Sequence, residues 1–119
     1  MSFAWLPLGV LAALAAPIAP AAPMPPRPAL CILEQNGVTA FAGRCRLHPA
    51  ADGGFSLGSD GAGPLLPGLT TLSVSPLRPS LAEVRGLTVQ GVNSRWGRAV
   101  RSSVDPACWQ GLDFAVCTY

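Results

Sequence analysis

A tryptophan and three arginines lie close together near the C-terminus, at Arg95, Trp96, Arg98 and Arg101. If this segment is a strand, side chains alternate between its two faces. Arg95 and Arg101 then share one face over small residues, whereas Trp96, Arg98 and Val100 share the other. Paired guanidinium donors beside an aromatic stacking platform would suit an anion or a glycan, so these four residues are the candidate binding site. The alternative is a solvated arginine pair on an outer face, which is common in proteins.

Residues suited to catalysis are few. His48 is the only histidine, and a triad could be drawn from it with Ser56 or Ser59 and Asp52 or Asp60. These residues lie on or beside predicted turns, and no nucleophile-elbow motif accompanies them. Asp52 and Asp60 also lack the regular spacing and closing glutamate of a calcium loop. We therefore expect no catalytic residues, no metal site and no cofactor, and hence a protein that is not an enzyme.

The four cysteines are Cys31, Cys45, Cys108 and Cys117, and none belongs to a C-x-x-C motif. An even number of cysteines with a single histidine indicates disulfides rather than a zinc site. Because short loops close most easily, the favoured pairs are Cys31 with Cys45 and Cys108 with Cys117.

The second pair fits a hairpin. A two-residue loop at Leu112-Asp113 places Cys108 directly opposite Cys117, at a non-hydrogen-bonded position where the Cα atoms lie only ~4.5 Å apart. The core face of this hairpin then holds the large apolar side chains Trp109, Phe114 and Val116. A four-residue loop is the alternative, because Leu112-Asp113 is not a usual primed turn.

The first pair requires an irregularity. A two-residue turn at Asn36-Gly37 would place Ala42, rather than Cys45, opposite Cys31. We therefore predict a β-bulge, which Gly43 could supply, or a different turn.

Short β-type runs separated by Gly, Asp, Asn and Pro make up the rest of the chain. Outside the hairpin, strands are predicted at 29–34, 38–48, 55–58, 69–74, 82–90 and 94–101. In the run 82–90, the apolar residues before Gly86 occupy even positions and those after it occupy odd positions. They would therefore lie on opposite faces of a regular strand, so Gly86 is predicted to mark a bulge that changes the face. About seven or eight short strands in succession predict an all-β fold, an antiparallel meander that closes into a small disulfide-stapled barrel or sandwich.

The N-terminus has the features of an export signal. Residues 3–19 are uncharged and mostly apolar, and small residues precede a possible cleavage point after Ala21. A membrane anchor is the alternative, but a span needs ~20 apolar residues and Pro7 and Pro17 interrupt this run. We expect a signal peptide at 1–21, a proline-rich tether at 22–28 and a single disulfide-bonded domain at 29–119. The expected location is the periplasm or outside the cell.

The charge is modest. The chain has eight basic residues, all arginine, and six acidic residues, for a net charge of +2. A dedicated nucleic-acid binder would be more basic. We expect a monomer whose partner is an envelope protein or a glycan, with no nucleic acid and no membrane span once the signal is removed.

The segment VNSRWGRAVR, followed by the pattern D-P-A-C-W-x-G-x-D-F-x-x-C-x-Y, resembles the C-terminal signature of a set of short exported bacterial proteins. The resemblance implies a shared small disulfide-bonded fold and carries no activity or site residues. In general plan the chain is also distantly similar to the periplasmic inhibitors of lysozyme, which are small disulfide-containing β-barrels. The expected function is a binding module of the cell envelope or the exterior, with a periplasmic inhibitor of a lysozyme-type hydrolase and a structural envelope domain as alternatives.

Overall fold

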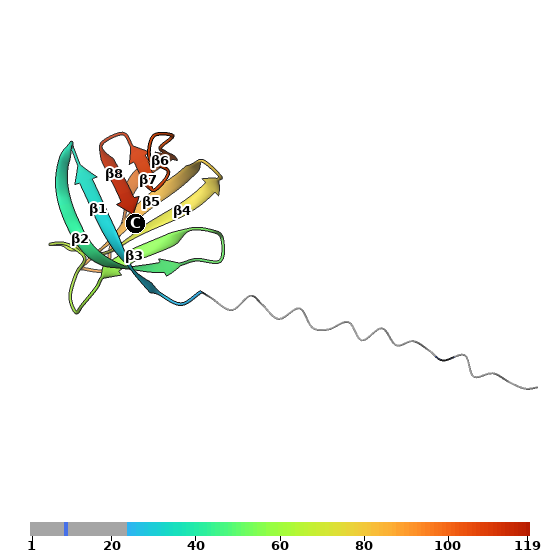
Figure 1. Cartoon of the computed structure of the whole chain (residues 1–119). Helices are drawn as coiled ribbons and strands as arrows, with labels where there is room; N and C mark the ends of the chain where they lie inside the picture. Colours follow the sequence, from blue (N-terminus) through green and yellow to red (C-terminus); the bar gives the residue numbers. More distant parts are fainter. Residues whose placement is uncertain (1–8, 10–23) are drawn as a thin grey trace, which may run out of the picture.

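Eight antiparallel strands follow one another in chain order and close into a barrel (Figure 1). The structure is a computed structural model that describes residue 9 and residues 24–119. The strands are β1 (Arg27–Gln35), β2 (Val38–Pro49), β3 (Phe55–Ser59), β4 (Leu69–Arg78), β5 (Leu81–Thr88), β6 (Asn93–Arg101), β7 (Cys108–Gly111) and β8 (Phe114–Thr118). The predicted all-β meander is confirmed, and the barrel is the form it takes.

The barrel closes where β1 pairs with β8, from Cys31 opposite Thr118 to Gln35 opposite Phe114. Beyond these pairs the backbone of Leu30 exchanges hydrogen bonds of 3.0 and 2.8 Å with Tyr119. The first and last strands are therefore held together over their full common length.

β1 begins at Arg27, two residues before the start predicted from the sequence. The predicted signal peptide lies outside the described residues, apart from residue 9. In the part of the chain that the structure describes, no helix has the length and apolar character needed to cross a membrane.

The interior of the barrel is filled by side chains. Alternate residues of each strand point inward, as the period of a β-strand requires. The largest fully buried side chains come from six of the strands: Leu33, Leu57, Leu72, Val74, Val84, Val116, Cys31 and Cys45. This core gives the barrel a rigid wall on which surface residues can be held in place.

Both predicted disulfides are present. Cys31 bonds to Cys45 with the Cα atoms 5.8 Å apart. The predicted bulge is also present, but it lies at Ala40, which is skipped between the pairs Leu33–Phe41 and Glu34–Thr39. Because of the bulge, Gly43 lies opposite Cys31. Cys45, two residues further along β2 on the same face, is then a diagonal neighbour of Cys31 and close enough to bond to it.

The C-terminal hairpin has the predicted register. Cys108 lies directly opposite Cys117, with a Cα separation of 4.0 Å, and Trp109 lies opposite Val116. Trp109, Phe114 and Val116 are all buried, as expected for the core face.

The bulge predicted at Gly86 is wrong. Gly86 pairs in unbroken register with Leu72 on one side and Ser94 on the other. It lies on the same buried face of β5 as Ala82 and Val84, whereas the apolar residues that follow it are exposed. The irregularity of this sheet region lies across from it, in β6.

The two ends of the barrel differ. We call the end that carries the turns 36–37, 60–68, 89–92 and 112–113 the barrel mouth. The connection 60–68 folds back over part of this mouth, where Leu65 donates to the backbone oxygen of Thr70 at 3.2 Å and is buried. The opposite end carries the connections 50–54, 79–80 and 102–107 together with the C-terminus.

Candidate functional site

A β-bulge in β6 determines where Trp96 points. Val84 of β5 pairs with Gly97 and Arg85 pairs with Arg95, so Trp96 is the extra residue between them. Gly97 has a φ of +123°, a conformation that residues with a side chain rarely adopt. Bulges re-aim side chains in this way, and here the bulge turns the indole toward the barrel mouth.

The indole is held from two sides. A Cβ on Gly86 would lie 2.8 Å from Nε1 of Trp96, so only a glycine leaves room for this edge of the ring. Phe114 packs against Trp96 in an edge-to-face arrangement, with ring centroids 5.6 Å apart and an interplanar angle of 71°. Trp96 is packed on the core by these contacts yet remains partly exposed.

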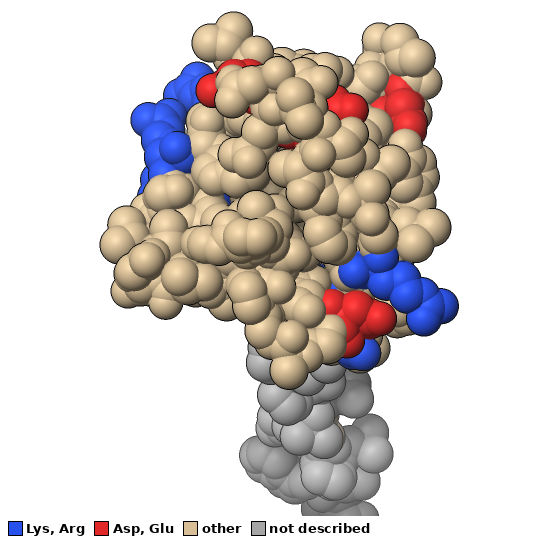
Figure 2. Space-filling model, turned by 90° about the vertical axis from the view of Figure 1, so that its left-hand side faces the viewer, with Lys and Arg blue, Asp and Glu red and all other residues tan. Residues whose placement is uncertain are grey.

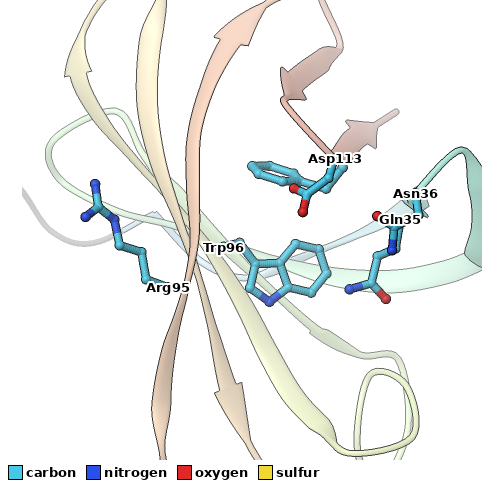
Figure 3. Close-up of a pocket in the computed structure, with 6 residues that line it drawn as sticks. Gln35, Asn36, Arg95, Trp96 and Asp113 are labelled. Carbon is cyan, nitrogen blue, oxygen red and sulfur yellow. The ribbon is translucent and has the colours of Figure 1, made fainter.

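A pocket of about 190 Å³ lies at this position. We call it the Trp96 pocket, and it is lined by Gln35, Asn36, Arg95, Trp96, Asp113 and Phe114. Figure 3 shows the six-membered edge of the Trp96 indole pointing toward Gln35 across the pocket, with Asp113 on the same side. Three parts of the chain that are distant in sequence therefore meet at one site.

The turns that supply the polar groups are fixed to each other. Asn36 and Gly37 both have positive φ, 52° and 76°, as a type I′ turn requires. The backbone N–H of Asn36 donates to the backbone oxygen of Asp113 at 2.7 Å. The β1–β2 and β7–β8 turns thus form one side of the pocket as a unit.

Arg95 turns its charge away from the pocket (Figure 3). Its Nε donates to Oε1 of Glu83 at 2.8 Å, and the same carboxylate oxygen lies 3.3 Å from Arg85. Arg95 and Asp113 are the charged members of the lining, with opposite signs. Because the Arg95 guanidinium is engaged by Glu83, the charge that faces the pocket is that of Asp113.

The structure does not bring the four candidate residues together. Arg98 is exposed on the outer face of β6, while Trp96 turns inward. Arg101 lies toward the opposite end of the barrel, with its guanidinium carbon 4.6 Å from the ring centroid of Trp109. The predicted grouping of Trp96 with Arg98, and of Arg95 with Arg101, is wrong because the bulge interrupts the alternation on which it was based. That Arg98 and Arg101 contact a ligand remains a prediction.

Arg101 contributes instead to a second pocket of about 180 Å³ at the far end. It lines this pocket together with Trp109, Phe55 and the turn at 52–54. Trp109 is only 5% exposed and belongs to the core, as predicted.

Basic residues form no continuous patch on the side of the barrel where β2 lies in Figure 1. Figure 2 shows that side, and its middle is largely uncharged, with basic groups at the left and lower right margins. This face therefore offers no extended site for an anion.

His48 lies exposed on β2, opposite Ser56 of β3. Asp52 is engaged elsewhere, because its Oδ1 accepts a hydrogen bond of 2.8 Å from the backbone N–H of Gly54. Within residues 24–119 no side-chain hydrogen bond joins His48 to Ser56, Ser59 or either aspartate. No group of three or more His, Cys, Asp or Glu residues in the described ranges could hold a metal ion.

At the end opposite the mouth, the pKa of Tyr119 is shifted. The hydroxyl of Tyr119 donates to Asp105, and this hydrogen bond is the main reason that the pKa of Tyr119 is raised above 10.0. Desolvation and repulsion from the carboxylate add to the shift. The contact ties the C-terminus to the connection 102–107.

Gln35, Asn36, Asp113 and Phe114 were not recognised as site residues from the sequence. Asn36 and Asp113 are turn residues, and the hairpin pattern explained them fully in that role. The glycine that follows Trp96 was the one signal available, since glycines often mark bulges in strands.

No family model, curated protein or solved structure matches the chain.

Proposed function

We propose that the protein is an exported, monomeric, non-enzymatic binding module that meets its ligand at the barrel mouth around Trp96. The observation that carries the proposal is the support given to one partly exposed tryptophan: a bulge in β6, the space above Gly86 and the ring of Phe114. Tryptophan is among the residues that contribute most to binding energy. The ligand belongs to the cell envelope or to the medium outside it, and is an envelope protein or a glycan.

The backbone at Gly97 supports this reading. A glycine with positive φ beside an interrupted strand pair gives up regular pairing, and such features occur often beside binding and active sites. The interruption of the strand pairing places an aromatic side chain among polar groups at the barrel mouth.

The disulfides support export. Cys31 and Cys45 are fully buried and bridge neighbouring strands, and Cys108 and Cys117 close the last hairpin. Disulfides that form part of a small domain in this way are typical of periplasmic and secreted proteins.

The surroundings of His48 support a role without catalysis. A general base needs a partner within hydrogen-bonding reach and a third group that orients it. His48 is exposed on a strand of the barrel wall, and the Asp52 carboxylate stabilises a turn.

The proposal can be tested by capture. The protein, purified oxidised from an exporting host, is immobilised and exposed to envelope and culture-medium extracts at low and high salt. We expect the wild type and the control Arg98→Ala to retain the same protein or glycan fraction, and Trp96→Ala to lose it. Retention should persist at high salt, because the nearest arginine is already paired with Glu83.

Trp96→Ala removes packed surface, so its fold must be verified by circular dichroism and by disulfide mapping. Trp96→Phe, which keeps an aromatic ring, provides a second variant and should retain part of the captured fraction. Equal retention by wild type and Trp96→Ala would contradict the proposal, as would the absence of any retained fraction.

A further inference from the structure

We infer that the Trp96 pocket binds one ring of a neutral saccharide through its polar groups, beside the indole of Trp96. This inference rests on the proposed function and specifies its ligand class. It is argued from the charge, the hydrogen-bonding groups, the fixed tryptophan and the size of the pocket.

The charge of the lining disfavours an anionic ligand. Arg95 is turned away and paired with Glu83 at 2.8 Å, so it offers little to an anion in the pocket. Asp113 adds a negative charge, which repels carboxylated or phosphorylated sugars. The same carboxylate would attract an organic cation, so tetramethylammonium is the competing probe in the titration.

The tryptophan that bounds the pocket is held in place. Trp96 is fixed at its Nε1 edge by Gly86 and on another side by Phe114. The ring is therefore pre-organised, and a ligand would lose little affinity in ordering it.

The polar groups match the hydroxyls of a sugar. Each hydroxyl can both donate and accept, and neighbouring hydroxyls present donors and acceptors side by side. Asp113 offers carboxylate oxygens that only accept, whereas the amides of Gln35 and Asn36 both donate and accept. A neutral polyhydroxylated ring satisfies this combination.

The dimensions agree with a single ring. The pocket volume of about 190 Å³ is below the roughly 300 Å³ at which pockets for drug-sized ligands begin. A neighbouring hollow of about 500 Å³ shares Asn36, Asp113 and Phe114 with it. A glycan whose end ring occupies the Trp96 pocket could therefore continue over the β1–β2 and β7–β8 turns, and an oligosaccharide should bind more tightly than a monosaccharide.

The test is a titration followed by nuclear magnetic resonance of the oxidised full-length protein. The probes are glucose, galactose and N-acetylglucosamine, their β-1,4-linked oligomers where these exist, glucuronic acid and tetramethylammonium. The indole N–H resonance of Trp96 is assigned by its loss in Trp96→Phe. Asp113→Asn removes the charged acceptor but keeps the size and the backbone contact to Asn36. Asp60→Asn, in the exposed 60–68 connection, is the matched control.

We expect at least one neutral sugar to shift the Trp96 indole signal at concentrations on the order of 1 mM. Its oligomer should bind more tightly, and Asp113→Asn should weaken binding about tenfold while Asp60→Asn leaves it unchanged. The inference is overturned if no neutral sugar shifts that signal up to about 50 mM, or if glucuronic acid or tetramethylammonium binds better. A Trp96-dependent capture of a protein without any sugar response would overturn the saccharide inference and leave the binding module standing.

Discussion

Arg95 of β6 donates from Nε to Oε1 of Glu83 on β5, with the two atoms 2.8 Å apart. Both residues lie on the outside of the barrel wall, and the Arg95 side chain points away from the indole of the next residue, Trp96 (Figure 3). Two adjacent residues of β6 therefore lie on different surfaces. The charged group of Arg95 lies on the outer face, whereas the ring of Trp96 lies in a pocket with two amide side chains and the carboxylate of Asp113.

Gly86→Ala should displace Trp96. The new Cβ would lie 2.5 Å from Cδ1 of Leu69 and 2.8 Å from Nε1 of Trp96, so at least one of these side chains must move. We expect a loss of about 1–3 kcal/mol in the free energy of unfolding and a shifted Trp96 indole resonance. Gly58→Ala is the control, because its nearest neighbours lie 3.8 Å away. An unshifted indole resonance in Gly86→Ala would mean that the glycine does not position the ring.

Gly97→Ala should distort the bulge that aims Trp96. An alanine at a φ of +123° is strained whatever space surrounds it, and the expected cost is about 1–3 kcal/mol. The retention of the ligand should fall together with the free energy of unfolding. Gly43→Ala is the control, because its new Cβ would meet only the ring of Phe41 at 3.7 Å, and it should change neither the retention nor the stability by much. Denaturant unfolding and the capture experiment measure the two effects, and equal behaviour of the two variants would contradict the assigned role of Gly97.

The two disulfides should differ in their reaction with a reductant. Cys31 and Cys45 are fully buried, whereas Cys108 and Cys117 are partly exposed. A thiol must reach the sulfur it attacks, so mild reduction of the native protein should open Cys108–Cys117 first. Alkylation followed by peptide mapping gives the order, and prior labelling of Cys31 and Cys45 would refute it. Replacing either pair by serine should cost about 2–4 kcal/mol.

Alkaline pH should weaken the C-terminal contact. The pKa of Tyr119 is raised in the folded protein, chiefly because its hydroxyl donates to Asp105. A raised folded pKa means that this group's contribution to stability is complete below pH 10.0, the unfolded value, and is lost as the pH rises through the folded value. Tyr119→Phe should therefore be less stable than the wild type near neutral pH, and the difference should disappear at high pH. Tyr119 is the only tyrosine, so its tyrosinate absorbance gives the pKa directly; an unshifted value would contradict the contact.

Local sequence spacing was enough to predict the C-terminal hairpin. Cys108 and Cys117 are symmetric about Leu112-Asp113, and this symmetry fixes the register because a two-residue turn leaves no freedom. The pairing of Cys31 with Cys45 was predicted because short loops close most easily, together with the need for a bulge or a different turn. The position of that bulge, at Ala40, depends on packing between strands and has no mark in the sequence.

The site was harder to predict because it depends on a second bulge. A strict period of two assigned Trp96 to the same face as Arg98, and a single extra residue reverses such an assignment. Gly86 was interpreted as a bulge because the apolar parity changes there. In the structure this glycine makes room for an indole from the neighbouring strand, a long-range relationship that no local pattern encodes. Barrel closure is long-range too, since it joins β1 to β8.

The most direct test of the Trp96 pocket is a comparison of its two indole environments in one spectrum. Envelope or culture-medium extract is added to isotope-labelled oxidised protein, and the indole N–H resonances of Trp96 and Trp109 are followed. We predict that the Trp96 signal shifts or broadens while that of Trp109, buried in the core at the other end of the barrel, stays in place. A change at Trp109 alone, or at neither tryptophan, would contradict a binding site at the barrel mouth.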